Sequence, residues 1–470
     1  MESRLLRLIE PKTQLDSRRK IFSNASLMQM IVPLFFEQLL TMMVGIADTF
    51  MISYAGDAAV SGVSLVNMFV TIFIYLFTAL AAGGAVVVSQ YIGSRNRENA
   101  DCSAGQLLTS AVIISVVLMG ITLAWDRHLL QFLFRKVEPD VMDACVIYLR
   151  ITALSFPALA VYNAGAALSR SCGRTDLTMK VSIAANIINV TGNAIGIFLL
   201  HAGVAGVAYP TLIARIFSAV VMTAVCFNQA QAVSYQWKNI LAWHPAMVRR
   251  ILKIAVPNGV ENGLFQLVKV ALSSITALFG TAQIAANGIA QSFWSLAAMI
   301  GVTMGPVFIT VVGQCMGSGD TEAAEYYFTK LHRMTLAGSI VWNILIFLVT
   351  PVIMLAYPLS DEIIHLVIVL VFIHNLFNAA VFPASGALPN GLRAAGDVRY
   401  TMYVAVISTI VIRFVLSVIL GIWMDLGVIG IAAAMCCDWM VRAALFLHRF
   451  RSGKWKKFQV ISPSTTKERV

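Results

Sequence analysis

The stretch IVPLFFEQLLTMMVGIADTF, residues 31–50, has the length and composition of a membrane-spanning helix apart from two carboxylates, Glu37 and Asp48. A span needs roughly 20 mostly apolar residues. A charge at its centre costs about 2.5 to 3.5 kcal/mol on insertion scales. At about 100° per residue, Glu37 and Asp48 point to nearly the same side of a helix. We therefore expect both carboxylates to face the protein interior rather than lipid.

The whole chain has the composition of a membrane protein. Of its 470 residues, 59% are hydrophobic and 12% charged, and the mean hydropathy is +0.79. Soluble domains are about 25% charged. The seven cysteines show no CxxC or Cys/His ligand spacing, which excludes a disulfide framework and a zinc site.

The hydropathy pattern predicts an all-α polytopic membrane protein with twelve spans. They lie at about residues 27–53, 59–90, 104–124, 140–166, 178–200, 204–228, 250–279, 283–315, 334–357, 361–388, 400–424 and 427–448. Most of the 34 Lys and Arg residues fall in the loops on one side of the membrane. That bias predicts cytoplasmic termini, and it accounts for the net charge of +11 without a nucleic-acid partner. The short loops favour the plasma (inner) membrane of a prokaryote.

The two halves of the chain repeat. Pro33 and Glu37 of PLFFE correspond to Pro257 and Glu261 of PNGVE. QYIGSRNRENA and QCMGSGDTEAA, and GVAGVA and GVIGIA, follow at the same offset, and RSCGRTDLTM resembles RAAGDVRYTM one residue out of register. Each half holds six spans, so the halves are predicted to be parallel repeats forming two pseudo-symmetric lobes. Such lobes suit alternating access.

This repeat predicts the domain organisation. A cytoplasmic segment (1–26) precedes the N-lobe (27–228), a cytoplasmic linker with an interfacial helix (229–249), the C-lobe (250–450) and a basic cytoplasmic tail (451–470). The linker contains tryptophan and leucine residues suited to the membrane surface.

The chain resembles the multidrug and toxic compound extrusion (MATE) family over nearly its whole length. The motifs are PLFFEQLLTMMVGIADT, the QYIGS loop, NIINVTGN followed by HAGVAGVAYPT, and DLGVIGIAAAMCCDWMVR. Members of that family are V-shaped, twelve-helix antiporters that exchange cytoplasmic organic cations for H⁺ or Na⁺. The resemblance implies that this chain, too, is an antiporter of small organic cations or drugs and not an enzyme. It also implies a monomer in the lipid bilayer and no cofactor beyond the coupling cation.

The resemblance also implies a coupling-ion site in the N-lobe. Asp48 stands where the family has an acidic residue in its first helix, and Asn189 and Asn193 stand at the family's polar positions in span 5. Asp48 would exchange a proton or Na⁺ during transport. The alternative is a structural carboxylate that is hydrogen-bonded to neighbouring helices.

The candidates for a substrate cavity are Glu37, Glu261, Asn375 and Asn378. Glu37 and Glu261 are repeat equivalents, which is compatible with paired function or with paired packing. Glu261 departs from the family pattern, since it follows its proline by four residues where the family's cation-binding Glu commonly follows by eight. In span 10, FIHNLFNAAVFP supplies His374 and two asparagines where many Na⁺-coupled relatives carry Asp.

Basic residues also fall inside the spans, namely Arg150, Arg215, Lys269 and Arg413. They could pair with acids, extend toward a membrane surface, or hold anionic partners. Asp438 and Arg442 have the i,i+4 spacing of a structural ion pair.

A polytopic membrane protein can have functions other than export. A lipid-linked oligosaccharide flippase of the same superfamily would use a groove rich in Arg and Lys, and it is the nearest alternative. Asp48 and the acidic repeat pair favour the exporter. A membrane-embedded zinc enzyme would need an HExxH-like spacing, and the seven histidines are scattered. A channel suits two lobes of this size less well.

Overall fold

The computed structural model describes residues 9–11, 15–134, 137–355 and 359–461, and within these ranges the regular structure is helical. Helices satisfy every backbone hydrogen bond internally, which lipid requires. Eleven helices are long and apolar enough to cross a membrane, or twelve when one bent pair is counted as a single span. The predicted all-α polytopic fold is therefore confirmed.

The bent pair consists of α6 (Pro139–Leu154) and α7 (Phe156–Ser171), which meet at Ser155 at an angle of 44°. Pro157 lies in the first turn of α7. A proline has no backbone N–H to donate, so it fits the first turn of a helix, where that N–H would have no partner within the helix. The sequence thus breaks this span near its middle.

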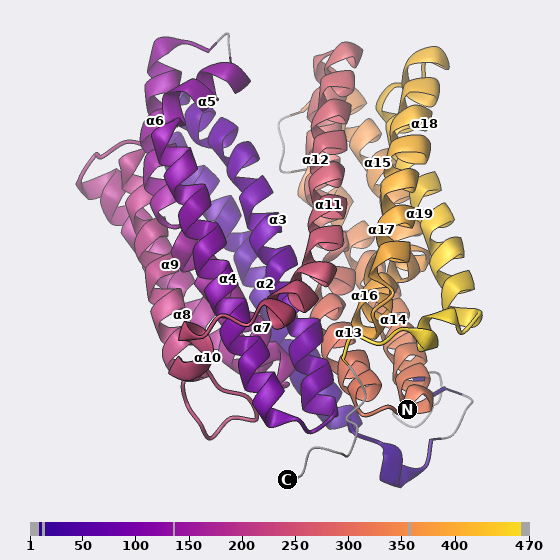
Figure 1. The fold of residues 1–470 in the computed structure, drawn as a ribbon. Helices are drawn as coiled ribbons and strands as arrows, with labels where there is room; N and C mark the ends of the chain where they lie inside the picture. The colour runs from indigo at the N-terminus through magenta and orange to yellow at the C-terminus, as the bar shows by residue number, and fades with distance from the viewer. Residues whose placement is uncertain (1–8, 12–14, 135–136, 356–358, 462–470) are drawn as a thin grey trace. The chain divides into compact units, whose positions relative to one another are not determined.

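The chain divides into two compact units, and the first, the N-unit, covers Ala25–Gly259. Figure 1 colours its helices from indigo to magenta. Besides α6 and α7, they are α2 (Asn24–Ser53), α3 (Asp57–Gly93), α4 (Arg97–Ala124), α5 (Asp126–Leu133), α8 (Thr175–Ala194), α9 (Ala205–Cys226) and the short α10 (Trp237–Leu241).

Glycines bring α8 and α9 into close contact. Gly192 lies against Pro210, and a Cβ added at Gly196, in the π-helical turn that extends α8, would come within 2.3 Å of the Gly206 carbonyl oxygen. Small residues let membrane helices approach closely. This contact places the polar face of α8 beside α9, where the candidate site lies.

The second unit, the C-unit, begins at Val260 and includes the described residues before Ala25. Helix α11 (Pro245–Thr276) belongs to this unit from residue 260 on. The other helices are α12 (Thr281–Ala297), α13 (Met299–Gly317), α14 (Thr321–Met354), α15 (Asp361–Ala380), α16 (Leu388–Ala395), α17 (Val398–Ile407), α18 (Val415–Val418) and α19 (Gly427–Arg451). They run from rose to yellow in Figure 1.

Helix α17 continues into a π-helical segment, Ser408–Phe414, and α18 into another, Ile419–Trp423. The close glycine contact recurs here: a Cβ at Gly430 of α19 would meet the Leu420 backbone carbon at 2.6 Å. π-Helical turns are often found at functional sites. The segment Ser408–Phe414 carries Arg413.

The start of the chain packs on α14 and forms an N-terminal strap, residues 9–11 and 15–22. Arg19 donates to both carboxylate oxygens of Asp320, at 2.8 and 2.5 Å. Lys330 donates to Glu10 at 2.6 Å. These contacts attach the strap to the C-unit, although the next residues along the chain form the first helix of the N-unit.

Candidate functional site

A chain of polar side chains links three helices of the N-unit. Asn193 of α8 donates to Asp48 Oδ1 of α2 at 2.7 Å, and it also lies 3.3 Å from Asn189 Oδ1, one turn away. Asn189 in turn donates to Thr211 Oγ1 of α9 at 3.0 Å. Asn189 and Asn193 are buried, whereas Asp48 is half-buried. The structure therefore brings all three sequence-predicted coupling-ion candidates together.

This arrangement leaves oxygen atoms available beside the Asp48 carboxylate. Asn193 Oδ1 is buried and has no hydrogen-bond partner among the described residues. Oxygen atoms of carboxylates and amides are the ligands of hard cations, and a carboxylate can instead take up a proton. The chemistry of the group therefore suits a hard cation or a proton.

Two further residues belong to this neighbourhood and were missed at the sequence level. Thr211 follows Pro210 in the YPT motif. The residues around it in the sequence do not predict that it faces Asn189. Tyr148 of α6 donates to Asn67 of α3 at 3.1 Å, and its hydroxyl interacts electrostatically with Asp48. A lone tyrosine in an apolar span carries no signal of such a contact.

Glu37 lies in a buried ion pair. Its Oε1 accepts from Arg170 at 2.7 Å and from the Tyr162 hydroxyl at 3.4 Å, and its Oε2 accepts from Thr178 at 2.8 Å. These bonds join α2 to α7 and α8. The charge of this candidate cavity residue is therefore neutralised within the N-unit.

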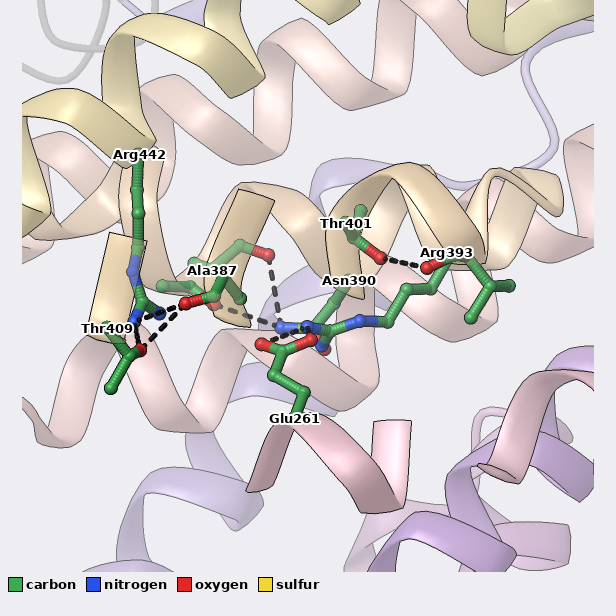
Figure 2. Close-up of polar contacts among 10 residues, drawn as sticks. Glu261, Ala387, Asn390, Arg393, Thr401, Thr409 and Arg442 are labelled. Carbon is green, nitrogen blue, oxygen red and sulfur yellow. Dashed lines mark hydrogen bonds and ion pairs between the residues drawn. The ribbon is translucent and has the colours of Figure 1, made fainter. Parts of the chain in front are cut away.

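Glu261 of the C-unit is likewise paired with an arginine. Arg393 Nη2 lies 2.7 Å from each Glu261 oxygen, and Arg393 Nη1 donates to Asn390 at 3.0 Å. Figure 2 shows the Glu261 carboxylate facing the Arg393 guanidinium. The repeat equivalence of the two glutamates thus extends to their partner arginines, and it favours paired packing over a free charge for attracting substrate.

The two span-10 asparagines bind α15 to α14. Asn378 donates to Asn343 Oδ1 at 3.3 Å, and Asn375 donates to the Asn343 carbonyl at 3.4 Å. Both are buried. The structure places these candidate cavity residues in a helix–helix contact.

The basic residues inside the spans differ in how they are paired. Arg150 forms an ion pair with Asp126, and Arg215 donates to Ser155 Oγ at 2.7 Å. Arg442 donates to Asp438 at 2.8 Å, so the predicted i,i+4 pair is confirmed. Arg413 and Lys269, the remaining two, lie in the C-unit and are treated separately below.

Comparisons with known proteins agree with this architecture. The family model described as MatE matches the chain twice, over residues 33–195 and 257–419, once in each half. YisQ of Bacillus subtilis, an uncharacterized transporter, is 27% identical over 92% of this chain and 94% of its own. A probable multidrug resistance protein, NorM, of Thermotoga maritima is 26% identical over 97% of each chain.

A solved structure has the same fold. The outward-facing conformation of a multidrug resistance MATE family transporter matches with a TM-score of 0.86 at 18% identity, covering 96% of this chain and 98% of that one. The double match of the family model confirms the sequence repeat and the resemblance on which the predicted site residues rest.

Proposed function

Since this chain belongs to the MatE family, whose members are transporters and not enzymes, we propose that it exports amphipathic organic cations from the cytoplasm in exchange for H⁺ or Na⁺. Its relatives include proteins named for multidrug resistance. The observation that carries the proposal is the Asp48–Asn193 hydrogen bond at 2.7 Å, inside a membrane span.

In this proposal Asp48 alternates between two states. Ionised, its carboxylate accepts the Asn193 amide N–H and attracts a cation. Once it is neutralised by H⁺ or Na⁺, the attraction for an organic cation is lost. Burial of a charged carboxylate in the membrane costs free energy. A change in the charge of Asp48 therefore changes which arrangement of the surrounding helices is more stable. Competition of two cations for one carboxylate is the simplest basis for antiport.

The proposal also concerns the membrane in which the protein lies, the side of its termini and its oligomeric state. The chain is a multi-pass membrane protein, and its bacterial relatives indicate a plasma membrane. The loop charge bias supports cytoplasmic termini. We propose that the protein acts as a monomer, because each unit contains its own paired acids and its own core.

The test is ethidium efflux from proteoliposomes with a pH gradient or a Na⁺ gradient imposed separately. Wild type should export under one of the two gradients, and Asp48→Asn should not, at matched protein level. Asp176→Asn is the control, because Asp176 is paired with Arg174 and Lys180 at a helix end. Normal transport by Asp48→Asn would show that Asp48 is structural. No transport by wild type under either gradient would overturn cation export.

A further inference from the structure

The C-unit contains a pocket whose charged lining is basic. It lies between α11, α12, α15, the π-helical segment Ser408–Phe414 and α19. Its polar lining residues include Lys269, Asn287, Gln291, His374 and Arg413. The described lining contains no Asp or Glu. A pocket of this composition in a membrane span favours a negatively charged ligand.

Arg413 has an incomplete set of partners. It is 7% exposed, and its Nη1 has no hydrogen-bond partner among the described residues. The nearest carboxylate, Asp438, lies 3.8 Å away. Asp438 accepts from Arg442 and from Ser408 through Oδ1, and its Oδ2, the oxygen nearer Arg413, has no hydrogen-bond partner among the described residues. One buried carboxylate is therefore shared by two guanidinium groups, which leaves positive charge uncompensated.

Two further lining residues, His374 and Lys269, carry nitrogen donors. His374 is 1% exposed, and neither of its ring nitrogens has a hydrogen-bond partner in the described part of the chain. Lys269 is exposed at the rim of the pocket, and it and Arg413 repel each other. Buried polar groups are nearly always hydrogen-bonded, so the unpartnered His374 nitrogens indicate a ligand that supplies the missing partner.

We propose that this pocket binds an anionic oxygen group, a carboxylate or a phosphate. Arg413 Nη1–H and a His374 N–H would donate to it, and Lys269 would attract it electrostatically at the rim. Hydrogen bonds from arginine to an oxyanion are charge-assisted and strong. The anion is either free in solution or the acidic group of an organic substrate. The proposal goes beyond cation export and does not depend on the role of Asp48.

The experiment is equilibrium dialysis of the detergent-solubilised full chain with radiolabelled benzoate, and separately with radiolabelled phosphate. Wild type should bind at least one of the two saturably. Arg413→Gln should weaken that binding at least tenfold, and Lys269→Gln several-fold. Arg215→Gln is the matched control, because Arg215 is also an intramembrane arginine but lies in the N-unit; it should bind as wild type does.

Each outcome decides the proposal. Absence of saturable binding of both probes by wild type overturns it, as does unchanged binding by Lys269→Gln and Arg413→Gln. Lys269→Gln keeps the test valid if Arg413→Gln fails to fold, because Lys269 is exposed. Preference for benzoate points to an organic acid, and preference for phosphate to an inorganic anion. Asp48→Asn should retain binding while losing efflux, which separates this proposal from cation export.

Discussion

The Glu261 carboxylate and the Arg393 guanidinium form an ion pair in which both carboxylate oxygens lie 2.7 Å from one nitrogen. Their side chains are only 15% and 10% exposed. The glutamate comes from α11 and the arginine from α16, so the pair joins two helices that are distant in sequence. The repeat-equivalent glutamate of the N-unit, Glu37, is also paired with an arginine, through one of its oxygens.

Removing one member of the Glu261–Arg393 pair should be strongly destabilising. Loss of one partner of a buried pair leaves an uncompensated charge and costs about 3–5 kcal/mol. We expect Glu261→Gln and Arg393→Gln each to lower the thermal unfolding midpoint, and the double variant to recover part of the loss. Differential scanning fluorimetry in detergent measures this. Additive losses in the double variant would argue against the pairing.

Substitutions along the N-unit polar chain should have graded effects on transport. Asn193 contacts Asp48 directly, whereas Asn189 reaches it only through Asn193 and Thr211 only through both. We therefore expect efflux rates to fall most for Asn193→Ala, less for Asn189→Ala and least for Thr211→Val. Initial ethidium efflux rates at matched protein level give the order. Equal losses in all three variants would contradict it.

Adding a methyl group between α8 and α9 should disturb both packing and transport. Gly196→Ala places a Cβ within 2.3 Å of a backbone oxygen, and overpacking typically costs about 1–3 kcal/mol. Separation of the helices would also lengthen the Asn189–Thr211 contact. We expect a lower unfolding midpoint and slower efflux. Gly120→Ala is the control, because nothing lies within 4 Å of its added Cβ.

The N-terminal strap should loosen in acid. Hydrogen bonds from Arg19 hold the pKa of Asp320 below its usual value of 3.8. A carboxyl with a lowered folded pKa contributes stability above its unfolded pKa and loses it as pH falls through the folded value. Arg19→Gln should therefore expose the strap to protease near pH 7 but match wild type well below pH 3.8. Limited proteolysis with an acid-active and a neutral protease measures this, and a difference that persists in acid would contradict it.

The sequence predicted the helices and the repeat because both leave a pattern along the chain. It also marked Glu37 and Glu261 as equivalent through their prolines. It could not show that Arg170 and Arg393 would meet them, because periodicity gives the face of a helix but not the helix that the face contacts. The arginines lie in the one repeat motif that is out of register, which obscured their equivalence.

The predicted span 334–357 illustrates a second limit. Helix α14 begins at Thr321, because Asp320 caps it by accepting from the Ala323 N–H at 2.9 Å. Its polar first turns bind the N-terminal strap, so they are stabilised by contacts outside the apolar region. Hydropathy detects the part of a helix that suits lipid and cannot detect its polar extension. The basic pocket was equally hidden, since its residues come from five separate segments.

The membership of the strap in the C-unit has a consequence for motion. The chain passes from one unit to the other twice, once before Ala25 and once within α11 after Gly259. Pro257 lies two residues before the second crossing and lacks the N–H that would complete the helix there, which makes that point easier to bend. The covalent path of the chain thus has a bendable point of α11 next to its second crossing.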